Sequence, residues 1–364
     1  MKRLAALLLL PALLLTGAVG AAPAASQAVH AERLDAFLDQ VEDSNAGIGS
    51  VSIFRNGHEV YARSFGQKQL TGVSYNADTT YQIASVTKMV TAILAFKLIE
   101  EGRLSLDDRL SKWFPDMPSA QAITIANLLE HTSGLGNFAI KDGTVWVVDR
   151  VSEPAILDEI RKQGVSFAPG QDTAYSNSAY LLLRMILEKQ SGRTYAEMVA
   201  QDIAAPLGLK NFASASVPQP DTFLSYAYEG DWAAIKDIDY SNVVGVGDIA
   251  GTPHDLNLLI TGLFQQKILR QASLQQMIPS PGKGWGRGLA AFPYGERHFL
   301  GHGGDVLGSH SRVIYNPDDG TAIAYSTNGE RIPTNDFFAA IVGLAYGEDI
   351  TFPKVVPAAG RQGP

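Results

Sequence analysis

The sequence predicts an α/β (α+β) protein, in which one antiparallel sheet is flanked by helices and interrupted by a mainly helical region. Three observations support this fold class. Strand-like segments occur near both ends of the chain, helical patterns fill the middle, and no internal repeat is visible. Together they indicate one sheet that is built from both ends of the chain.

The elements of the N-terminal part follow from local patterns. Segment 31–41 carries apolar residues at helical spacing, so a helix is expected there. Segments 48–54 and 60–65 have the composition of strands, and Asn56-Gly57 between them is a strong hairpin signal. Segment 87–101 contains neither Gly nor Pro and is predicted to be a helix.

The middle and C-terminal parts alternate helices and loops before the sheet resumes. A region punctuated by Pro and Gly extends to about Gly170 and contains a predicted short helix at 125–130. Further helices are predicted at 179–190 and 253–264, on either side of a loop-rich segment, 206–248. The chain then returns to three strands and a closing helix, predicted at 299–307, 309–315, 321–326 and 335–346.

The first 25 residues have the pattern of a secretory signal peptide. Two basic residues precede an uncharged run from Leu4 to Leu15, and small residues follow, which predicts cleavage between Gly20 and Ser26. The alternative is an uncleaved membrane anchor, which needs about 20 strongly apolar residues. We expect a periplasmic or secreted protein that has no lipid-modified cysteine and is not inserted stably in a membrane after cleavage.

The rest of the chain is predicted to form one unit. Residues 26–350 are expected to be a single domain with a helical insertion at about 105–270, and 351–364 a C-terminal tail. The composition, 46% hydrophobic and 18% charged over 364 residues, is that of a globular protein. A net charge of −8 argues against nucleic acid as a partner. The absence of cysteine excludes disulfides, thiolate metal sites and a thiol nucleophile.

A serine and a lysine at the start of the predicted helix 87–101 are candidates for catalysis. Ser85 and Lys88 form an S-x-x-K pattern, and positions i and i+3 share one helix face. The helix N-terminus favours a developing alkoxide, and a buried lysine with a lowered pKa can accept the serine proton. The pattern alone is a weak signal. Its second copy, at 280–283, lies in a Pro-Gly turn without a helix and is set aside.

Two further motifs add to this pattern. Tyr-Ser-Asn at 175–177 precedes an apolar helix, and a phenol beside a lysine can relay a proton while an amide holds the lysine or a substrate carbonyl. His-Gly-Gly at 302–304 enters a late strand, where glycines let a substrate backbone approach the strand edge.

The order and spacing of these motifs resemble the serine β-lactamase and penicillin-binding protein superfamily. The branch with class C β-lactamases, D-Ala-D-Ala carboxypeptidases and related esterases is most similar, because its motifs are S-x-x-K, Y-x-N and a counterpart of K-T-G. Ile-Ala-Asn-Leu-Leu-Glu-His-Thr-Ser-Gly-Leu at 125–135 and Pro-Leu-Gly-Leu at 206–209 are also typical of the branch. The resemblance covers the mature chain and implies a β-lactamase/transpeptidase-like fold. Its spacing favours Tyr175 over a second Tyr-Ser-Asn triplet at 240–242.

The resemblance assigns roles to individual residues. Ser85 is expected to be the acylated nucleophile, and Lys88 and Tyr175 to manage its proton. The backbone N–H groups of Ser85 and Asp305 are expected to form the oxyanion hole. His131, inside the stretch 125–135, is expected to be structural. The residues expected at the substrate or the oxyanion are Asn177, His302, Gly303, Gly304 and Asp305.

The third motif differs from K-T-G in a way that concerns the substrate. His302 replaces a lysine and is mostly neutral at pH 7, since the ordinary pKa of histidine is near 6.5. Gly303 replaces a threonine and removes a hydroxyl donor. Both changes weaken recognition of the carboxylate that β-lactams and D-Ala-D-Ala termini share, so efficient β-lactamase activity is not expected. Arg312, on the following strand, either supplies the missing charge or is an ordinary strand residue.

These inferences lead to one functional prediction and its alternatives. We expect an exported serine hydrolase with an acyl-enzyme on Ser85, cleaving a small ester or a D-amino-acid peptide or amide, as a carboxypeptidase or an esterase does. The alternatives are a non-hydrolytic penicillin- or cell-wall-peptide-binding protein and a weak β-lactamase. The partner is a small-molecule or peptidoglycan-derived substrate, and the oligomeric state stays open. No cofactor is expected. No metal is expected either, because no carboxylate stands at ligand spacing beside His298 and His302, with His310 nearby.

Overall fold

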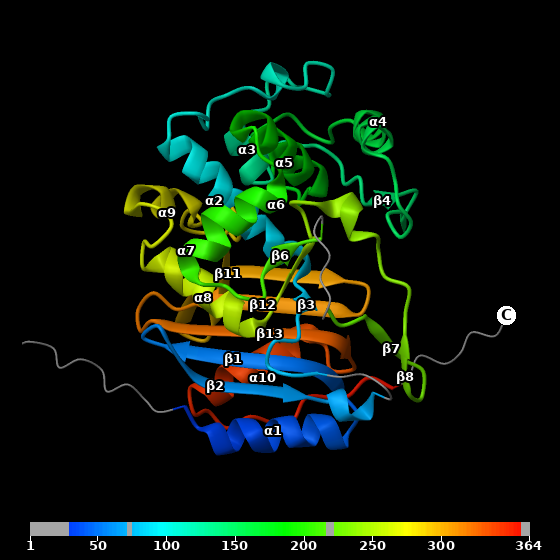
Figure 1. Cartoon of the computed structure of the whole chain (residues 1–364), viewed down its shortest axis with the longest axis vertical. Helices are drawn as coiled ribbons and strands as arrows, with labels where there is room; N and C mark the ends of the chain where they lie inside the picture. Colours follow the sequence, from blue (N-terminus) through cyan, green and yellow to red (C-terminus); the bar gives the residue numbers. More distant parts are fainter. Residues whose placement is uncertain (1–28, 71–74, 216–221, 358–364) are drawn as a thin grey trace, which may run out of the picture.

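The computed structural model describes residues 29–70, 75–215 and 222–357; the predicted signal peptide lies outside these ranges. Its main feature is a six-stranded antiparallel sheet with the strand order β10-β11-β12-β13-β1-β2 (Figure 1). The strands are β1 (Gly47–Arg55), β2 (His58–Phe65), β10 (Ala290–Tyr294), β11 (Arg297–Val306), β12 (Ser309–Tyr315) and β13 (Thr321–Glu330).

The first and last strands of the chain pair in the centre of the sheet, which confirms the predicted antiparallel sheet. β1 pairs with β13 from Gly47 opposite Glu330 to Arg55 opposite Thr321. The β1–β2 hairpin turns at Asn56-Gly57, whose φ angles of 51° and 82° are those that a tight hairpin turn requires. This is why Asn-Gly was a reliable signal in the sequence.

Helices cover both faces of the sheet. α1 (Ala31–Asp43) and α10 (Thr334–Ala345) pack on one face, and α8 (Pro253–Phe264) packs on the other (Figure 1). Successive side chains of β13 alternate between the two cores, with Ile323 on the α1–α10 side and Ala324 on the α8 side. Each large aliphatic or aromatic side chain buried in this way contributes about 1.5–3 kcal/mol to stability.

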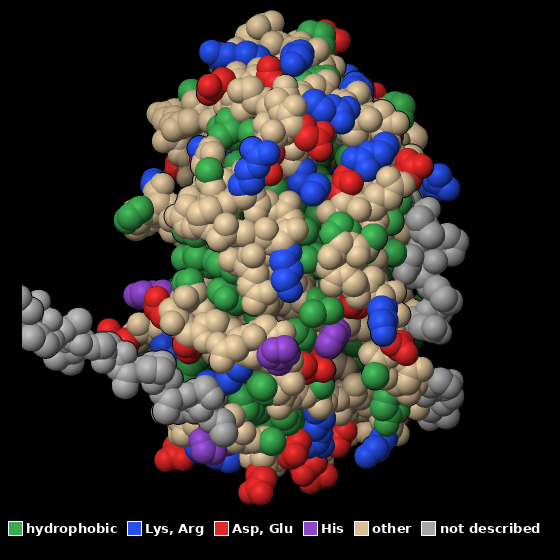
Figure 2. Space-filling model, turned by 60° about the vertical axis from the view of Figure 1, so that its left-hand side comes forward, with side chains coloured by type: hydrophobic (Ala, Val, Ile, Leu, Met, Phe, Trp, Pro, Cys, Tyr) green, Lys and Arg blue, Asp and Glu red, His purple; other side chains and the backbone are tan. Residues whose placement is uncertain are grey.

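Acidic side chains gather at the lower end of the molecule, at the level of α1 (Figure 2). Arg63 on β2 forms ion pairs with three of them, Asp35, Asp39 and Glu42. These pairs hold α1 against the edge strand.

A mainly helical region lies above the sheet in Figure 1 and is inserted between β2 and β10. Its central helix, α2 (Thr87–Glu100), is apolar nearly all round and packs against α5 (Asn177–Ser191). The other helical elements are α3 (Ile125–Leu129), α4 (Glu153–Gln163), α6 (Tyr195–Met198), a π-helical turn (Val199–Ala204), α7 (Ala205–Leu207) and α9 (Gln271–Met277). Within the described residues, no helix combines the length and hydrophobicity needed to cross a bilayer.

Short elements complete the region. A three-stranded sheet has the order β3-β9-β6, and two hairpins are formed by β4 with β5 and by β7 with β8. The strands are β3 (Tyr81–Gln82), β4 (Ile140–Lys141), β5 (Thr144–Val145), β6 (Ala213–Ser214), β7 (Tyr226–Tyr228), β8 (Trp232–Ala234) and β9 (Ile249–Gly251). The 3₁₀ helices are Gln67–Gln69, Ala84–Val86, Leu110–Lys112 and Tyr240–Val243.

Several elements are missing from the sequence prediction, among them α9 and the short strands, and two of the missing elements, α4 and β10, contain a proline. The region up to Gly170 was expected to contain only the short helix at 125–130, yet α4 also forms there with Pro154 in its first turn, where proline is tolerated. β10 contains Pro293 and is the edge strand of the sheet, the position where a strand accepts proline.

Candidate active site

Ser85 lies in the 3₁₀ turn Ala84–Val86 that leads into α2. Ala84 has a φ of 46°, an unfavourable value for a residue with a side chain, so the backbone before the serine is strained. β11 passes close by at Gly304, where an added Cβ would lie 2.2 Å from the Ile83 carbonyl oxygen and 2.7 Å from the Ser85 nitrogen. Only glycine allows this approach, which brings the end of β11 to the serine.

Lys88 is directly beside this serine. Its Nζ lies 2.9 Å from Ser85 Oγ and donates a second hydrogen bond of 2.9 Å to the carbonyl oxygen of Val246. The side chain is fully buried, and among the described residues no acidic group forms an ion pair with it. Burial therefore lowers the pKa of Lys88 well below its ordinary value of 10.5, which favours a neutral amine.

The loop that contains Val246 is held in place by two hydrogen bonds of the neighbouring Gly245. The Gly245 N–H donates to Asp248 Oδ1 at 2.7 Å, and the Gly245 carbonyl accepts a 2.6 Å bond from Thr91 on α2. Asp248 is fully buried, and burial raises its pKa to about 6. The contact between the Val246 carbonyl and Lys88 was not predicted, because a backbone carbonyl leaves no signature in a sequence.

Tyr175 completes the group around the lysine. It precedes Ser176, the N-cap of α5, and its ring lies 4.8 Å from Lys88 Nζ. Its hydroxyl is buried and forms no hydrogen bond of normal geometry among the described residues, although the Ser85 side chain lies close enough to interact with it. Burial raises the pKa of Tyr175 above its ordinary value, while the neighbouring Ser85 side chain acts in the opposite direction. The phenol beside the serine is thus neutral.

His131 fixes the position of this tyrosine. Its Nδ1 accepts a 3.2 Å hydrogen bond from the Ser176 N–H, and its ring packs against Tyr175 with centroids 4.5 Å apart. Burial lowers the pKa of His131 well below 6.5, so the ring is neutral. This geometry agrees with the structural role expected for His131.

The motif predicts that His302 lies at the substrate, but its side chain does not line the cleft beside Ser85. Its side chain is 1% exposed and packs against Trp285, with ring centroids 5.4 Å apart. Nδ1 donates to the Gly303 carbonyl at 2.6 Å, which leaves Nε2 buried without a partner among the described residues. Burial lowers the pKa of His302 to about 3. The ring is therefore neutral, and it is buried against Trp285 rather than exposed to the solvent.

Arg312 occupies the space that the absent side chain of Gly303 leaves free. The two residues are paired across β11 and β12, and a Cβ on Gly303 would lie 2.9–3.0 Å from atoms of the arginine side chain. The Arg312 side chain lines the cleft, but its Nη1 forms a 3.0 Å ion pair with Asp305 Oδ1. Arg312 is thus neither an exposed strand residue nor a free cation, because Asp305 offsets its charge.

The remaining predicted residues lie around Ser85. Asp305 follows Gly304 on β11, and its side chain also accepts a 2.8 Å bond from His310. Asn177 donates from Nδ2 to Asn137 Oδ1 at 3.0 Å, while its own Oδ1 is buried without a partner among the described residues. An unsatisfied amide oxygen in the same recess as Ser85 is suited to a hydrogen-bond donor of a ligand.

A solvent-open recess, here called the open cleft, extends from Ser85 along β10 and β11. It has a volume of about 460 Å³ and contains both polar and aromatic side chains. Trp285, which the sequence analysis left as a packing residue by default, forms part of its wall and is 37% exposed. The residues that line the open cleft include Ser85, Tyr175, Trp285, Phe292, Gly303, Asp305, Arg312 and Asn335.

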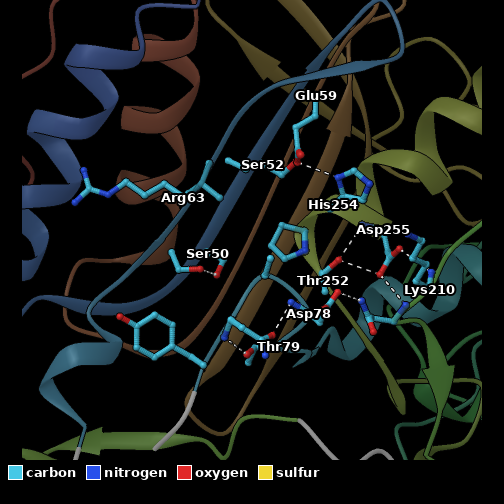
Figure 3. Close-up of a pocket in the computed structure, with 18 of the residues that line it drawn as sticks. Ser50, Ser52, Glu59, Arg63, Asp78, Thr79, Lys210, Thr252, His254 and Asp255 are labelled. Atoms are coloured by element: carbon cyan, nitrogen blue, oxygen red, sulfur yellow. Dashed lines mark hydrogen bonds and ion pairs between the residues drawn. The ribbon is translucent and has the colours of Figure 1, made fainter.

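A second recess of similar size, about 470 Å³, contains none of the predicted site residues. Figure 3 shows that its polar groups are largely engaged with one another. Glu59 accepts hydrogen bonds from Ser52 and His254, and Asp255 accepts from Thr252 and from the backbone of Lys210. These contacts give the acidic groups structural roles. Within the described part of the chain, no cluster of three or more His, Cys, Asp or Glu side chains is arranged to hold a metal ion.

Comparison with known proteins identifies similar sequences. The beta-lactamase family model matches residues 34–346. The putative penicillin-binding protein PbpX of Bacillus subtilis is 28% identical over 270 residues, which is 72% of this chain and 67% of the relative. Esterase EstB of Burkholderia gladioli is 32% identical over 219 residues, 55% of either chain. The D-alanyl-D-alanine-carboxypeptidase/endopeptidase AmpH of Escherichia coli is 29% identical, over 66% of this chain and 64% of its own. The chain thus spans between 55% and 67% of the length of these relatives.

Solved structures agree with the fold. The D-amino acid amidase of Ochrobactrum anthropi SV3, complexed with L-phenylalanine, aligns with a TM-score of 0.72 and 27% identity, covering 82% of this chain and 91% of the other. The octameric penicillin-binding protein homologue of Pyrococcus abyssi aligns with a TM-score of 0.74 and 24% identity, covering 87% and 78%. The β-lactamase/transpeptidase-like fold expected from the sequence is confirmed.

Proposed function

This chain belongs to the beta-lactamase family, and from that premise we propose that it is an exported serine hydrolase that forms an acyl-enzyme on Ser85. The observation that carries the proposal is the 2.9 Å approach of Lys88 Nζ to Ser85 Oγ in a site that keeps the amine neutral. The signal-peptide pattern of residues 1–25 supports export.

Acylation follows from the geometry in two proton transfers. The neutral Lys88 amine donates to the Val246 carbonyl, so its lone pair is free to accept the Ser85 proton as Oγ attacks the substrate carbonyl. The backbone N–H groups of Ser85 and Asp305 stabilise the oxyanion. The proton then passes through Lys88 and Tyr175 to the leaving group, whose bond to the carbonyl carbon breaks. Water hydrolyses the resulting ester in the same way.

We infer that the preferred substrate is a small ester or amide without an essential carboxylate. His302 is neutral and buried, and Asp305 neutralises Arg312, so the cleft offers little net positive charge for an anion. The names of relatives agree with acyl transfer in general, since they include an esterase and a D-alanyl-D-alanine carboxypeptidase/endopeptidase. A carboxypeptidase is the second candidate, and Arg312 favours it because its side chain lines the open cleft.

A substrate panel tests the proposal. The purified protein is incubated with p-nitrophenyl esters, D-amino-acid amides, a D-Ala-D-Ala peptide and a fluorescent penicillin, and Ser85→Ala serves as the control. We expect ester or amide turnover that Ser85→Ala abolishes, with little penicillin turnover. Faster cleavage of the D-Ala-D-Ala peptide, lost in Arg312→Ala, would select the carboxypeptidase. Labelling by penicillin without turnover of any substrate would favour a binding protein, and turnover that survives Ser85→Ala would refute the nucleophile.

A further inference from the structure

Ser85 borders a third recess, here called the aliphatic recess, on the side away from Trp285. Its volume is about 170 Å³, and of the described residues that line it, Ser85, Asn177 and Asp305 have polar side chains. Aliphatic side chains form most of the wall, and none of the described lining residues is aromatic or basic. The wall residues that matter here are Ile140, Val145, Val147, Ile238, Val243 and Leu307.

The mouth of this recess exposes apolar surface to water. Ile140 and Val145, paired across the β4–β5 hairpin, are 40% and 38% exposed, and Leu307 after β11 is 36% exposed. Few large hydrophobic side chains in the described residues are exposed to this extent. These three all line the recess that contains Ser85. An exposed apolar rim of this kind indicates a surface that a ligand covers.

The position of Tyr175 decides which part of the substrate enters which recess. Tyr175 lines the open cleft but not the aliphatic recess. The leaving group must receive a proton from the Lys88–Tyr175 pair, so it has to depart on the side of the open cleft. The carbonyl oxygen points to the Ser85 and Asp305 N–H groups, which leaves the aliphatic recess for the acyl substituent.

We propose that the acyl group of the substrate is an uncharged aliphatic chain bound in the aliphatic recess, with the leaving group in the open cleft. This inference rests on the proposed serine hydrolase function and names its acyl specificity. In the reaction, the bond from the carbonyl carbon to the leaving oxygen or nitrogen breaks, and the leaving group takes up the proton from Ser85. The aliphatic acyl group then stays on Ser85 until water releases it as a carboxylic acid.

The test is a series of p-nitrophenyl esters from acetate to butyrate to hexanoate. Because each buried methylene group contributes about 0.8 kcal/mol, kcat/KM is expected to rise about fourfold per methylene until the recess is full. A second series keeps the acetyl group and lengthens an alkyl alcohol instead, and this series should rise much less.

Two variants locate the effect. Val145→Asp places a charge at the rim of the recess and is expected to flatten the rise of kcat/KM with acyl length. Val60→Asp is the matched control, because Val60 is 45% exposed on β2 and is not part of the recess. It should keep the rise with chain length.

A wild-type series that is flat or falls with acyl length would overturn the inference, as would a Val145→Asp variant with the wild-type slope. A rise confined to the alcohol series would overturn the assigned orientation. These results differ from a failure of the proposed function, in which even the acetate ester shows no turnover that depends on Ser85.

Discussion

Replacing Lys88 by alanine is expected to lower kcat/KM by roughly 10²–10⁴-fold, the usual contribution of a positioned general base. The wild-type activity should increase with pH as the amine loses its proton. Because burial lowers the pKa of Lys88, this increase should be complete well below pH 10.5. The kcat/KM of a p-nitrophenyl ester, measured over the pH range in which the fold is stable, tests both statements.

The matched control for this variant is Lys97→Ala in the same helix. Lys97 is partly exposed and donates only a 3.4 Å bond to the Ile268 carbonyl, so its loss should leave kcat/KM nearly unchanged. A Lys88→Ala variant that keeps wild-type activity would exclude Lys88 as the base. An activity increase that is centred at the ordinary lysine pKa would contradict the neutral amine.

Replacing Tyr175 by phenylalanine removes one oxygen and is expected to lower kcat about 10²-fold or more, with a smaller effect on KM. The ring contacts with His131 and Lys88 remain possible. Since the Tyr175 hydroxyl is buried and has only a weak interaction with the Ser85 side chain, its loss should change the free energy of unfolding little. Steady-state kinetics and denaturant unfolding of one preparation measure both effects.

Tyr180→Phe should behave in the opposite way. Tyr180 packs against the same His131 ring, but its hydroxyl donates a 2.9 Å bond to the Leu129 carbonyl. Its loss is expected to cost about 1 kcal/mol or more of stability and to leave kcat near the wild-type value. If Tyr175→Phe lost stability and kept activity, the role of Tyr175 would be packing alone.

Local patterns predicted most of the sheet and the helices that flank it. The strand-like composition of these segments and the Asn-Gly turn act over a few residues, so their signal survives in the sequence. Helix α4 and strand β10 were missed because Pro154 and Pro293 read as breaks when the surroundings are unknown. Only the tertiary structure shows that one begins a helix and the other lies on an edge.

The site was predictable where chemistry depends on residue type and order, as for Ser85, Lys88 and Tyr175, which the fold brings together. Contacts made by the backbone or across distant segments were not predictable. The Val246 carbonyl that holds Lys88 is 158 residues away along the chain. The burial of His302 and the pairing of Arg312 with Asp305 likewise depend on how strands and loops meet, which a motif does not specify.

Mass spectrometry of the covalent intermediate tests the central claim, that Ser85 carries the acyl group. The protein is quenched in acid during turnover of a p-nitrophenyl ester, and separately treated with a fluorophosphonate, which forms a stable bond to an activated serine. The account predicts one adduct per chain, mapped to Ser85 and absent from Ser85→Ala. An adduct on another residue, or a Ser85→Ala variant that hydrolyses the ester at the wild-type rate, would contradict it.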